Sequence, residues 1–356
     1  MSKKVVCVLF GGASSEHEVS RSSAANVLNN IDRELFQVVA IGITKEGSWY
    51  LTEAEPDEIK SGEWEKINKK ACVISPDAKH HGVLVFNKNG DVSITKVDVV
   101  LPVLHGKNGE DGTVQGLFEL AKIPYVGNGV LASCTCMDKS VTKRLLEKAG
   151  IDVTEGFTVY DYKETDFEKV LETTEKEISF PVVVKPSNAG SSVGVSLAEN
   201  EDGLKEALSL AAKEDRVILI ERAVDAREVE CAVLGNYRKI ESATPGEIIK
   251  TTKMYDYETK YIDDTSSTQI PAELTQEQTE RLKAIACKAF SAMGCFGLAR
   301  VDFFIDKKDG RILLNEINTL PGFTDISLYP KAWEHEGLTY KDLITRIIEL
   351  SLEREI

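Results

Sequence analysis

Short apolar runs alternate with polar and glycine-rich segments along the chain, and this pattern predicts buried strands joined by turns and helices. Helical patterns end near residues 29, 150 and 177, and another begins near Thr113. A polar stretch around Trp49, Trp64 and residues 66–70 is interpreted as surface. Because strands and helices alternate, we expect an α/β (α+β) architecture. The predicted strands are 4–10, 37–43, 97–104, 156–159, 182–184, 195–197, two within 217–234, 299–305 and 311–317.

The last two apolar runs, 299–305 and 311–317, are separated by the turn sequence KKDG and predict a hairpin. Alternation puts Glu316 and Asn318 on one face of the second strand, and cross-strand pairing can bring Asp302 opposite them. Two carboxylates and an amide oxygen are hard ligands suited to Mg²⁺, with phosphate oxygens completing the shell. The alternative is a pair of solvated acidic side chains. Since both interrupt apolar strands, where an unpaired charge is costly, we favour the metal site.

Composition narrows the class of protein. The 356 residues are enough for two or three domains, and 42% apolar with 28% charged residues is typical of a globular chain. A net charge of −15 argues against nucleic acid or an anionic membrane as the partner. The start carries no cleavage signature and no run approaches about 18 apolar residues, so a cytoplasmic protein is expected. The seven cysteines form no CxxC motif and are interpreted as idle thiols.

The first strand, a glycine turn and the following helix are typical of an open sheet that binds ligands at the carboxyl ends of its strands. Ser15 and Glu18 have capping-box spacing, which predicts the helix start. Glu16 lies in the first turn, where a carboxylate either stabilises the helix dipole or receives a substrate ammonium group. His105 ends the strand at 97–104, where it either meets an anionic ligand or is simply solvated.

A glycine and serine loop at 188–194 joins two strands, unlike a P-loop, which leads into a helix. Lys185 closes the first strand, and the hydroxyls of Ser191 and Ser192 with backbone N–H groups are suited to covering phosphates. A plain hairpin turn needs neither the lysine nor the serines. We therefore favour a phosphate-binding lid.

Glu221 and Glu228 lie on either side of a strand connector. Such connectors between lobes suit contacts with adenine and ribose, although exposed strand-end glutamates are the simpler interpretation of position alone. The segment 246–270 is polar with an aromatic cluster of Tyr255, Tyr257 and Tyr261. It is typical of a mobile lid that excludes water from a reactive intermediate, and the alternative is a disordered loop.

Six segments in order along nearly the whole chain resemble the D-alanine–D-alanine ligases of the ATP-grasp superfamily. The resemblance implies an N-terminal Rossmann-like substrate domain at 1–127, a small central lid domain at 128–222, and a C-terminal catalytic domain at 223–356 with the mobile loop. The matching segments are EHEVS at 16–20, LHGKNGEDGTVQG at 104–116, KPSNAGSSVG at 185–194, MYDYETKY at 254–261, ARVDFF at 299–304 and NEINTLPGFT at 315–324.

The resemblance implies a ligase that joins two D-alanines through a D-alanyl phosphate, for peptidoglycan precursor synthesis. Asp302, Glu316 and Asn318 would hold two Mg²⁺ ions, which Mn²⁺ could replace. A cytoplasmic homodimer is also implied, with D-alanine and ATP as the substrates. The side chains that would bind ATP are those of Lys139, Lys185, Ser192, Glu221 and Glu228.

For the two amino acids, the resemblance assigns separate subsites. Glu16 would bind the ammonium group of the first D-alanine, and His105 would lie near its carboxylate. Ser327 and Leu328 would line the subsite of the second D-alanine.

The resemblance also assigns the groups around the reacting atoms. Arg300 and the backbone N–H of Gly322 would stabilise the tetrahedral oxyanion of acyl transfer. Glu16, Ser191 and Tyr261 would form a hydrogen-bonded trio that closes the site.

Three alternatives remain open. Variant ligases that join D-alanine to D-serine or D-lactate share most of these segments, although Tyr261 and Leu328 resemble the D-alanine pattern. If the chain were an inactive ATP-grasp regulatory module, some of the expected ATP-binding or metal-binding residues would be replaced. All of them are present. Another carboxylate-amine ligase of the superfamily would lack the EHEVS and MYDYETKY segments.

Overall fold

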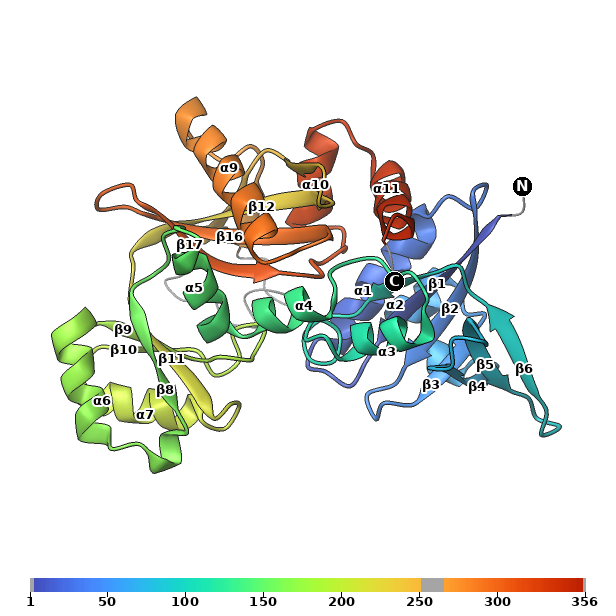
Figure 1. Ribbon diagram of the computed structural model, residues 1–356, viewed down its shortest axis with the longest axis horizontal. Helices are drawn as coiled ribbons and strands as arrows, with labels where there is room; N and C mark the ends of the chain where they lie inside the picture. The colour runs from blue at the N-terminus through green and yellow to red at the C-terminus, as the bar shows by residue number, and fades with distance from the viewer. Residues whose placement is uncertain (1–2, 251–265, 355–356) are drawn as a thin grey trace.

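The computed structural model describes residues 3–250 and 266–354, whose strands form three sheets (Figure 1). In the N-terminal sheet the strand order is β6-β5-β4-β3-β2-β1-β7, and β1 runs parallel to its neighbours β2 and β7. The carboxyl ends of these three strands point toward the middle of the molecule. The elements of this part are β1 (Lys4–Gly11), α1 (His17–Asn30), β2 (Phe36–Ile43), β3 (Trp49–Thr52), α2 (Pro56–Ser61), η1 (Glu63–Lys66), β4 (Lys69–Ile74), β5 (Gly82–Phe86), β6 (Val92–Lys96), β7 (Val99–Val103) and α3 (Thr113–Ala121).

The second sheet has the order β10-β9-β11-β8 and is entirely antiparallel. Figure 1 shows α6 and α7 beside this sheet, while α4 and α5 connect it to the rest of the molecule. The elements are α4 (Val130–Met137), α5 (Lys139–Lys148), β8 (Gly156–Tyr160), η2 (Tyr162–Glu164), α6 (Phe167–Thr173), η3 (Thr174–Ile178), β9 (Val182–Pro186), β10 (Ser196–Ala198), α7 (Glu201–Ala211) and β11 (Val217–Arg222).

The third sheet has the order β15-β14-β12-β16-β17, with β13 paired to β12. One of its cores includes α4, α5 and α9, while α10 and α11 share a second core with α1 and the N-terminal sheet. The third sheet is therefore packed against both of the other parts. Its elements are β12 (Ala226–Gly235), β13 (Ile240–Ser242), β14 (Gly246–Lys250), β15 (Ser266–Gln269), α9 (Gln276–Ala292), β16 (Gly297–Asp306), β17 (Ile312–Asn318), α10 (Leu328–His335) and α11 (Tyr340–Leu352).

The predicted strands and helices are present, and the mixed α/β fold is confirmed. The three sheets fall within the three predicted segments, while the domain boundaries themselves stay a prediction. Within the two described ranges, no helix combines the length and apolar character that crossing a bilayer requires.

The predicted capping box at Ser15 and Glu18 is wrong. Helix α1 begins at His17 with Glu16 as its N-cap, and no side-chain capping bond forms. Glu18 is therefore one position too early in the helix to reach back to the cap. The Ser14 hydroxyl instead accepts the backbone N–H of Glu16 at 3.2 Å.

The surface interpretation holds for Lys66, Asn68 and Lys70, which are exposed, but it is wrong for Trp64. Trp64 is fully buried, with its ring edge-on to Phe10 at a centroid distance of 5.1 Å. A Cβ at Gly42 would lie 2.4 Å from the Trp64 ring, so glycine is required beneath it. Residues 66–70 lead from η1 into β4, which extends the N-terminal sheet beyond β3.

The predicted loop 246–270 is shorter than expected. Its ends form β14 and β15, which pair antiparallel from Glu247 with Gln269 to Lys250 with Ser266. The predicted cluster of Tyr255, Tyr257 and Tyr261 lies outside the described residues.

Candidate active site

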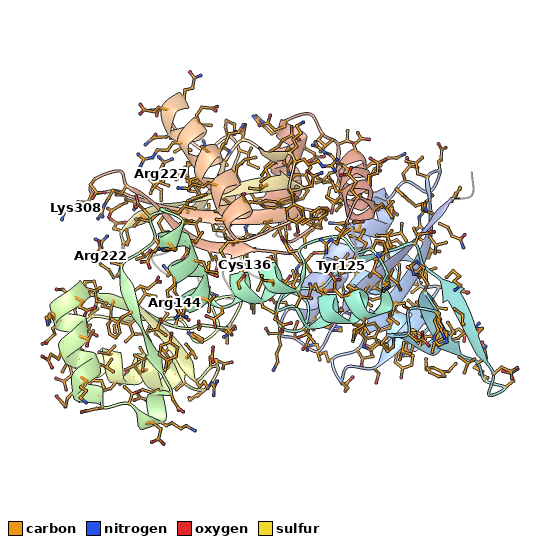
Figure 2. The ribbon with its side chains drawn as sticks, in the orientation of Figure 1. Tyr125, Cys136, Arg144, Arg222, Arg227 and Lys308 are labelled. Atoms are coloured by element: carbon orange, nitrogen blue, oxygen red, sulfur yellow. The ribbon has the colours of Figure 1, made fainter. Side chains whose placement is uncertain are left out.

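A cavity of about 60 Å³ lies where the three sheets meet. Figure 2 shows Cys136, one of the lining residues, near the centre of the molecule on α4. The lining includes the predicted residues Glu16, His105, Lys139, Ser191, Arg300, Glu316, Asn318 and Gly322.

Glu16 forms one wall of the cavity and is buried, with 7% of its surface exposed. Its Oε1 accepts the hydroxyl proton of Ser191 at 2.5 Å. A Cβ at Gly106 would lie 2.3 Å from Oε2, and one at Gly190 would lie 3.2 Å from it. The carboxylate therefore occupies space that exists only because two glycines flank it, and its contact with Ser191 agrees with two members of the predicted trio.

His105 is buried, and both of its ring nitrogens are hydrogen-bonded within the protein. Nδ1 lies 3.1 Å from the Leu320 carbonyl oxygen, and Nε2 lies 3.1 Å from the Ser23 hydroxyl. Because a carbonyl only accepts, Nδ1 carries the proton and Nε2 accepts from Ser23. Burial lowers the pKa of His105, which favours this neutral form. His105 thus supports the turn at Leu320, and its predicted role near a substrate carboxylate stays a prediction.

The predicted hairpin of β16 and β17 is confirmed, with Asp302 opposite Glu316 and Arg300 opposite Asn318. Arg300 donates from Nε and Nη2 to the two carboxylate oxygens of Asp302 at 2.8 and 2.7 Å. The Asn318 side-chain amide donates to the same carboxylate at 2.9 Å. Glu230 on β12, which was not predicted, lies 3.1 Å from Arg300 Nε. The strand pairing therefore gathers the predicted groups into one cluster.

These oxygens fit a hard divalent cation in chemistry. Asp302 and Glu316 are adjacent carboxylates, and Asn318 adds an amide oxygen beside them. Among the residues that the structure describes, no three His, Cys, Asp or Glu side chains form a metal site by themselves. Phosphate oxygens would therefore have to complete the shell, as expected for Mg²⁺ bound with a nucleotide.

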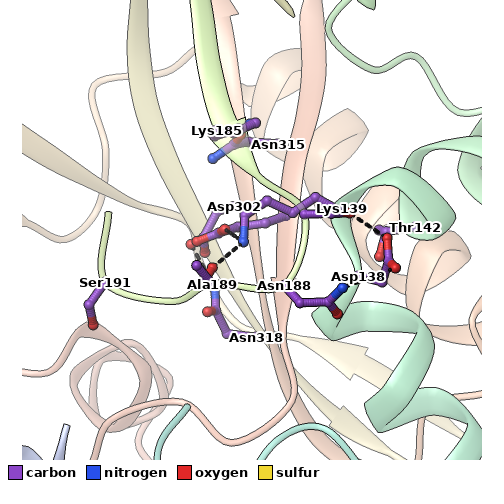
Figure 3. A network of polar contacts seen from close by, with 12 residues as sticks. Asp138, Lys139, Thr142, Lys185, Asn188, Ala189, Ser191, Asp302, Asn315 and Asn318 are labelled. Carbon is purple, nitrogen blue, oxygen red and sulfur yellow. Dashed lines mark hydrogen bonds and ion pairs between the residues drawn. The ribbon is translucent and has the colours of Figure 1, made fainter. Parts of the chain in front are cut away.

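The lysines of the predicted nucleotide site surround this cluster (Figure 3). Lys139 Nζ donates to the Ala189 carbonyl at 2.7 Å and lies 3.6 Å from Glu316 Oε2. Lys185 Nζ lies 3.4 Å from Asn315 Oδ1. The pairing of β16 with β17 skips Asn315, and this bulge turns its side chain toward Lys185. Both predicted lysines therefore lie beside the hairpin.

Glu221 is a fully enclosed carboxylate between two ammonium groups. Its oxygens pair with Lys143 and Lys185, and all three side chains are buried. Burial alone raises the pKa of Glu221, but the two lysines outweigh it and the pKa is lowered from its usual range. Lys143 was missed by sequence reasoning. Its position one helical turn after Lys139 on α5 is the signal that indicates it.

The predicted phosphate loop has a constrained backbone. Ser191 and Ser192 have φ of 52° and 58°, in the left-handed region that side chains other than glycine rarely adopt. The base of the loop is bound to the start of α5, because Ser187 and Asn188 both donate to Asp138. The base of the loop is therefore fixed to the start of α5 beside the cavity.

Glu110 was also missed by sequence reasoning, although it lies inside the segment LHGKNGEDGTVQG. Its Oε2 accepts the Gly106 N–H at 2.8 Å, and its Oε1 accepts the Leu320 N–H at 2.9 Å. Burial, together with the nearby Glu16 carboxylate, raises the pKa of Glu110 to about 7.

Several predicted residues lie away from the cavity. Ser327 precedes α10 and bonds to Thr324, while Leu328 is buried in the core near Gly246. Glu228 lies on β12 opposite Ile248 and Phe304. Tyr261 lies outside the described residues. Ser327 adjoins the lining residue Gly322, and the predicted subsite for a second amino acid stays a prediction.

The three packed sheets, with a serine-bearing loop above a carboxylate hairpin, define a protein of the ATP-grasp fold. Models of two protein families match the chain: "D-ala D-ala ligase N-terminus" over residues 5–128 and "D-ala D-ala ligase C-terminus" over residues 145–349. The chain belongs to the D-alanine–D-alanine ligase family.

Individual relatives agree with this assignment. The chain is 51% identical to a D-alanine–D-alanine ligase of Acetivibrio thermocellus, covering 99% of this chain and 96% of that protein. It is 46% identical to one of Thermoanaerobacter sp., covering 99% and 98%. Among solved structures, the VanG D-Ala:D-Ser ligase of Enterococcus faecalis superposes with a TM-score of 0.89 at 37% identity, covering 98% of this chain and all of that one. The D-alanine–D-alanine ligase of Coxiella burnetii gives 0.83 at 33% identity, covering 99% and 95%.

Proposed function

We propose that the protein joins two molecules of D-alanine with hydrolysis of ATP to ADP and phosphate, for cell-wall precursor synthesis. The observation that carries the proposal is the single cavity that brings Glu16, Arg300 and Gly322 together from distant parts of the chain. These are an ammonium acceptor, a cation and a backbone donor, which amino-acid activation and acyl transfer both require.

In the first step a carboxylate oxygen of the first D-alanine attacks the γ-phosphorus of ATP, and ADP leaves. Glu16 holds the ammonium group of this D-alanine, since its carboxylate is buried and faces the cavity. Lys139 and Lys185 neutralise the phosphate oxygens, and Ser192 in the loop above contributes a hydroxyl. Glu221 orients Lys185, while Glu228 contacts the nucleoside.

In the second step the amine of another D-alanine attacks the acyl carbon, the bond from that carbon to the phosphate oxygen breaks, and the amine loses a proton. Arg300 and the Gly322 N–H stabilise the oxyanion. A Cβ at Gly322 would lie 2.8 Å from the Ser327 hydroxyl, so the turn needs glycine there. As part of the same proposal, Ser327, Leu328 and Tyr261 lie near the incoming D-alanine.

Mg²⁺ would be held by Asp302, Glu316 and Asn318, and when bound it supplies charge neutralisation at the transferred phosphoryl group. In the structure Arg300 occupies both oxygens of Asp302. The carboxylate that would help to hold the cation is therefore also the one that positions Arg300.

The test is incubation of the purified protein with ATP, Mg²⁺ and D-alanine. We expect phosphate release in proportion to D-alanyl-D-alanine measured by mass spectrometry. ATP binding without turnover on any D-amino acid would contradict the proposal. Because the Enterococcus faecalis structure is named a D-Ala:D-Ser ligase, D-serine and D-lactate should be offered in competition as the second substrate. A predominance of the mixed product would favour that alternative.

A further inference from the structure

The turn that carries Gly322 lies between β17 and α10 and is held mainly by side chains from the N-terminal part of the chain. The N–H of Leu320 donates to Glu110 at 2.9 Å, and its carbonyl accepts from His105 at 3.1 Å. The N–H of Phe323 donates to the Ser23 hydroxyl at 3.2 Å. Both residues that flank Pro321 and Gly322 are therefore fixed by partners from outside their own sheet.

Glu110 differs from the other partners because it also binds the opposite wall of the cavity. Its second oxygen accepts the Gly106 N–H at 2.8 Å. Gly106 is packed so closely on Glu16 that an added Cβ would lie 2.3 Å from Oε2. A shift of Gly106 toward Glu16 would therefore press on the Glu16 carboxylate, because the two are in close contact.

We propose that Glu110 is a positioning residue that fixes the separation between the ammonium site at Glu16 and the backbone N–H of Gly322. This inference rests on the proposed function. One carboxylate bridges the two walls through charge-assisted bonds, which are stronger than those between neutral groups. A bound D-alanine spans the same two walls, so the spacing set by Glu110 fixes where its carboxyl carbon lies relative to the oxyanion donor.

The substitution Glu110→Gln tests this inference, because an amide has one acceptor oxygen and leaves one of the two N–H groups without a partner. We expect kcat for dipeptide synthesis to fall about 10- to 100-fold, as for a misplaced reacting group, with little change in KM for D-alanine. Glu110→Ala should lose more activity. Glu110→Asp keeps the charge but is one methylene too short to bridge both walls, so it should not restore kcat.

Asp111→Asn is the matched control. The Asp111 carboxylate also accepts two backbone N–H groups, from Asn108 at 2.8 Å and Thr113 at 3.0 Å, but both lie in its own loop. We expect its kcat to stay near that of the parent protein. Equal losses in both variants would overturn the inference in favour of general loop destabilisation, which thermal unfolding of both proteins measures in parallel.

Two further outcomes have distinct meanings. A rise in KM for D-alanine with unchanged kcat in Glu110→Gln would overturn the positioning role and make Glu110 an ammonium ligand. An unchanged kcat and KM would also overturn it. Failure of the parent protein to form dipeptide would instead contradict the proposed function, so the two failures are distinguishable.

Discussion

Ser191 donates its hydroxyl proton to Glu16 at 2.5 Å across 175 residues of sequence, and this bond joins the phosphate loop to the N-terminal sheet. The bond holds the loop beside the cavity that Glu16 lines. The same contact therefore positions both the loop and the proposed ammonium acceptor.

Replacing Ser191 by Ala removes this bond and leaves Glu16 Oε1 without its hydroxyl donor. We expect KM for D-alanine to rise about tenfold. Loss of a hydrogen bond to a charged group that contributes about 1.4 kcal/mol gives a change of this size. Ser192→Ala is the comparison, because Ser192 has nearly the same backbone conformation with φ of 58°. Its change should appear mainly in KM for ATP. Steady-state kinetics with each substrate varied separately checks both expectations. An effect of Ser191→Ala on KM for ATP and of Ser192→Ala on KM for D-alanine would contradict the roles proposed for the two serines.

Gly106→Ala should disable the site without unfolding the protein. The new Cβ would lie 2.3 Å from Glu16 Oε2, and φ of +67° strains any side chain at this position. We expect kcat/KM for D-alanine to fall by more than about tenfold. The control is Gly116→Ala in α3, where a Cβ meets nothing within 4 Å. That change should leave activity intact and raise the free energy of unfolding by about 0.5 to 1 kcal/mol.

Asp302→Asn should remove Mg²⁺-dependent activity while the fold is retained. The change removes a carboxylate from the proposed metal site and weakens the paired bonds to Arg300. We expect kcat to fall by about two orders of magnitude, and Mn²⁺ binding in the presence of ADP to weaken in electron paramagnetic resonance. Asp309→Asn in the turn of the same hairpin is the control, since Asp309 pairs only with the nearby Arg311 in the described contacts. Unchanged metal binding in Asp302→Asn would contradict the metal assignment.

The fold and the hairpin were predictable because their signals are local. Alternation of apolar residues and the KKDG turn fix the register of Asp302 opposite Glu316, which the structure confirms. The burial of Trp64 was not predictable in this way, since the space that receives it exists only when Gly42 and Phe10 come together in the sheet.

The missed residues Glu110 and Lys143 have partners that lie far away in sequence. Glu110 bonds to Leu320 across 210 residues, and the carboxylate paired with Lys143 is on the far strand β11. A charged side chain in a polar segment gives no sign of such a partner. The assignment of Leu328 rests on the family pattern and stays a prediction, while its burial in the core depends on how α10 packs.

Lys143→Met should destabilise the protein because it leaves Glu221 buried with one cation in place of two. We expect a loss of about 3 kcal/mol in the free energy of unfolding measured in urea. The double variant Lys143→Met with Glu221→Gln should lose less than the sum of the single changes, because the two charges interact directly. Lys148→Met, at an exposed position of the same helix, is the control and should have little effect.

The pH dependence of the reaction should report Glu110. Only the ionised carboxylate offers both oxygens as full acceptors to Gly106 and Leu320, and burial raises the pKa of this group to about 7. The other charged or titratable groups that act on it are Glu16, Arg300 and the buried Cys136. Burial lowers the pKa of His105, which also bonds to Leu320, so that His105 stays neutral in this range. We therefore expect kcat to rise as pH increases through about 7.

Stability should change in the opposite direction over the same range. A carboxyl group whose pKa in the folded protein lies above its ordinary 4.5 stabilises the fold fully below that value, and the contribution is lost as pH rises through about 7. Glu110→Gln does not titrate, so its kcat should be flat through about pH 7 and its stability should fall less between about pH 4.5 and about pH 7. Rate profiles and urea unfolding of both proteins from about pH 5 to about pH 9 check the two trends. A rising limb that persists unchanged in Glu110→Gln would assign the titration to another group and leave the bridge between Gly106 and Leu320 without a role in it.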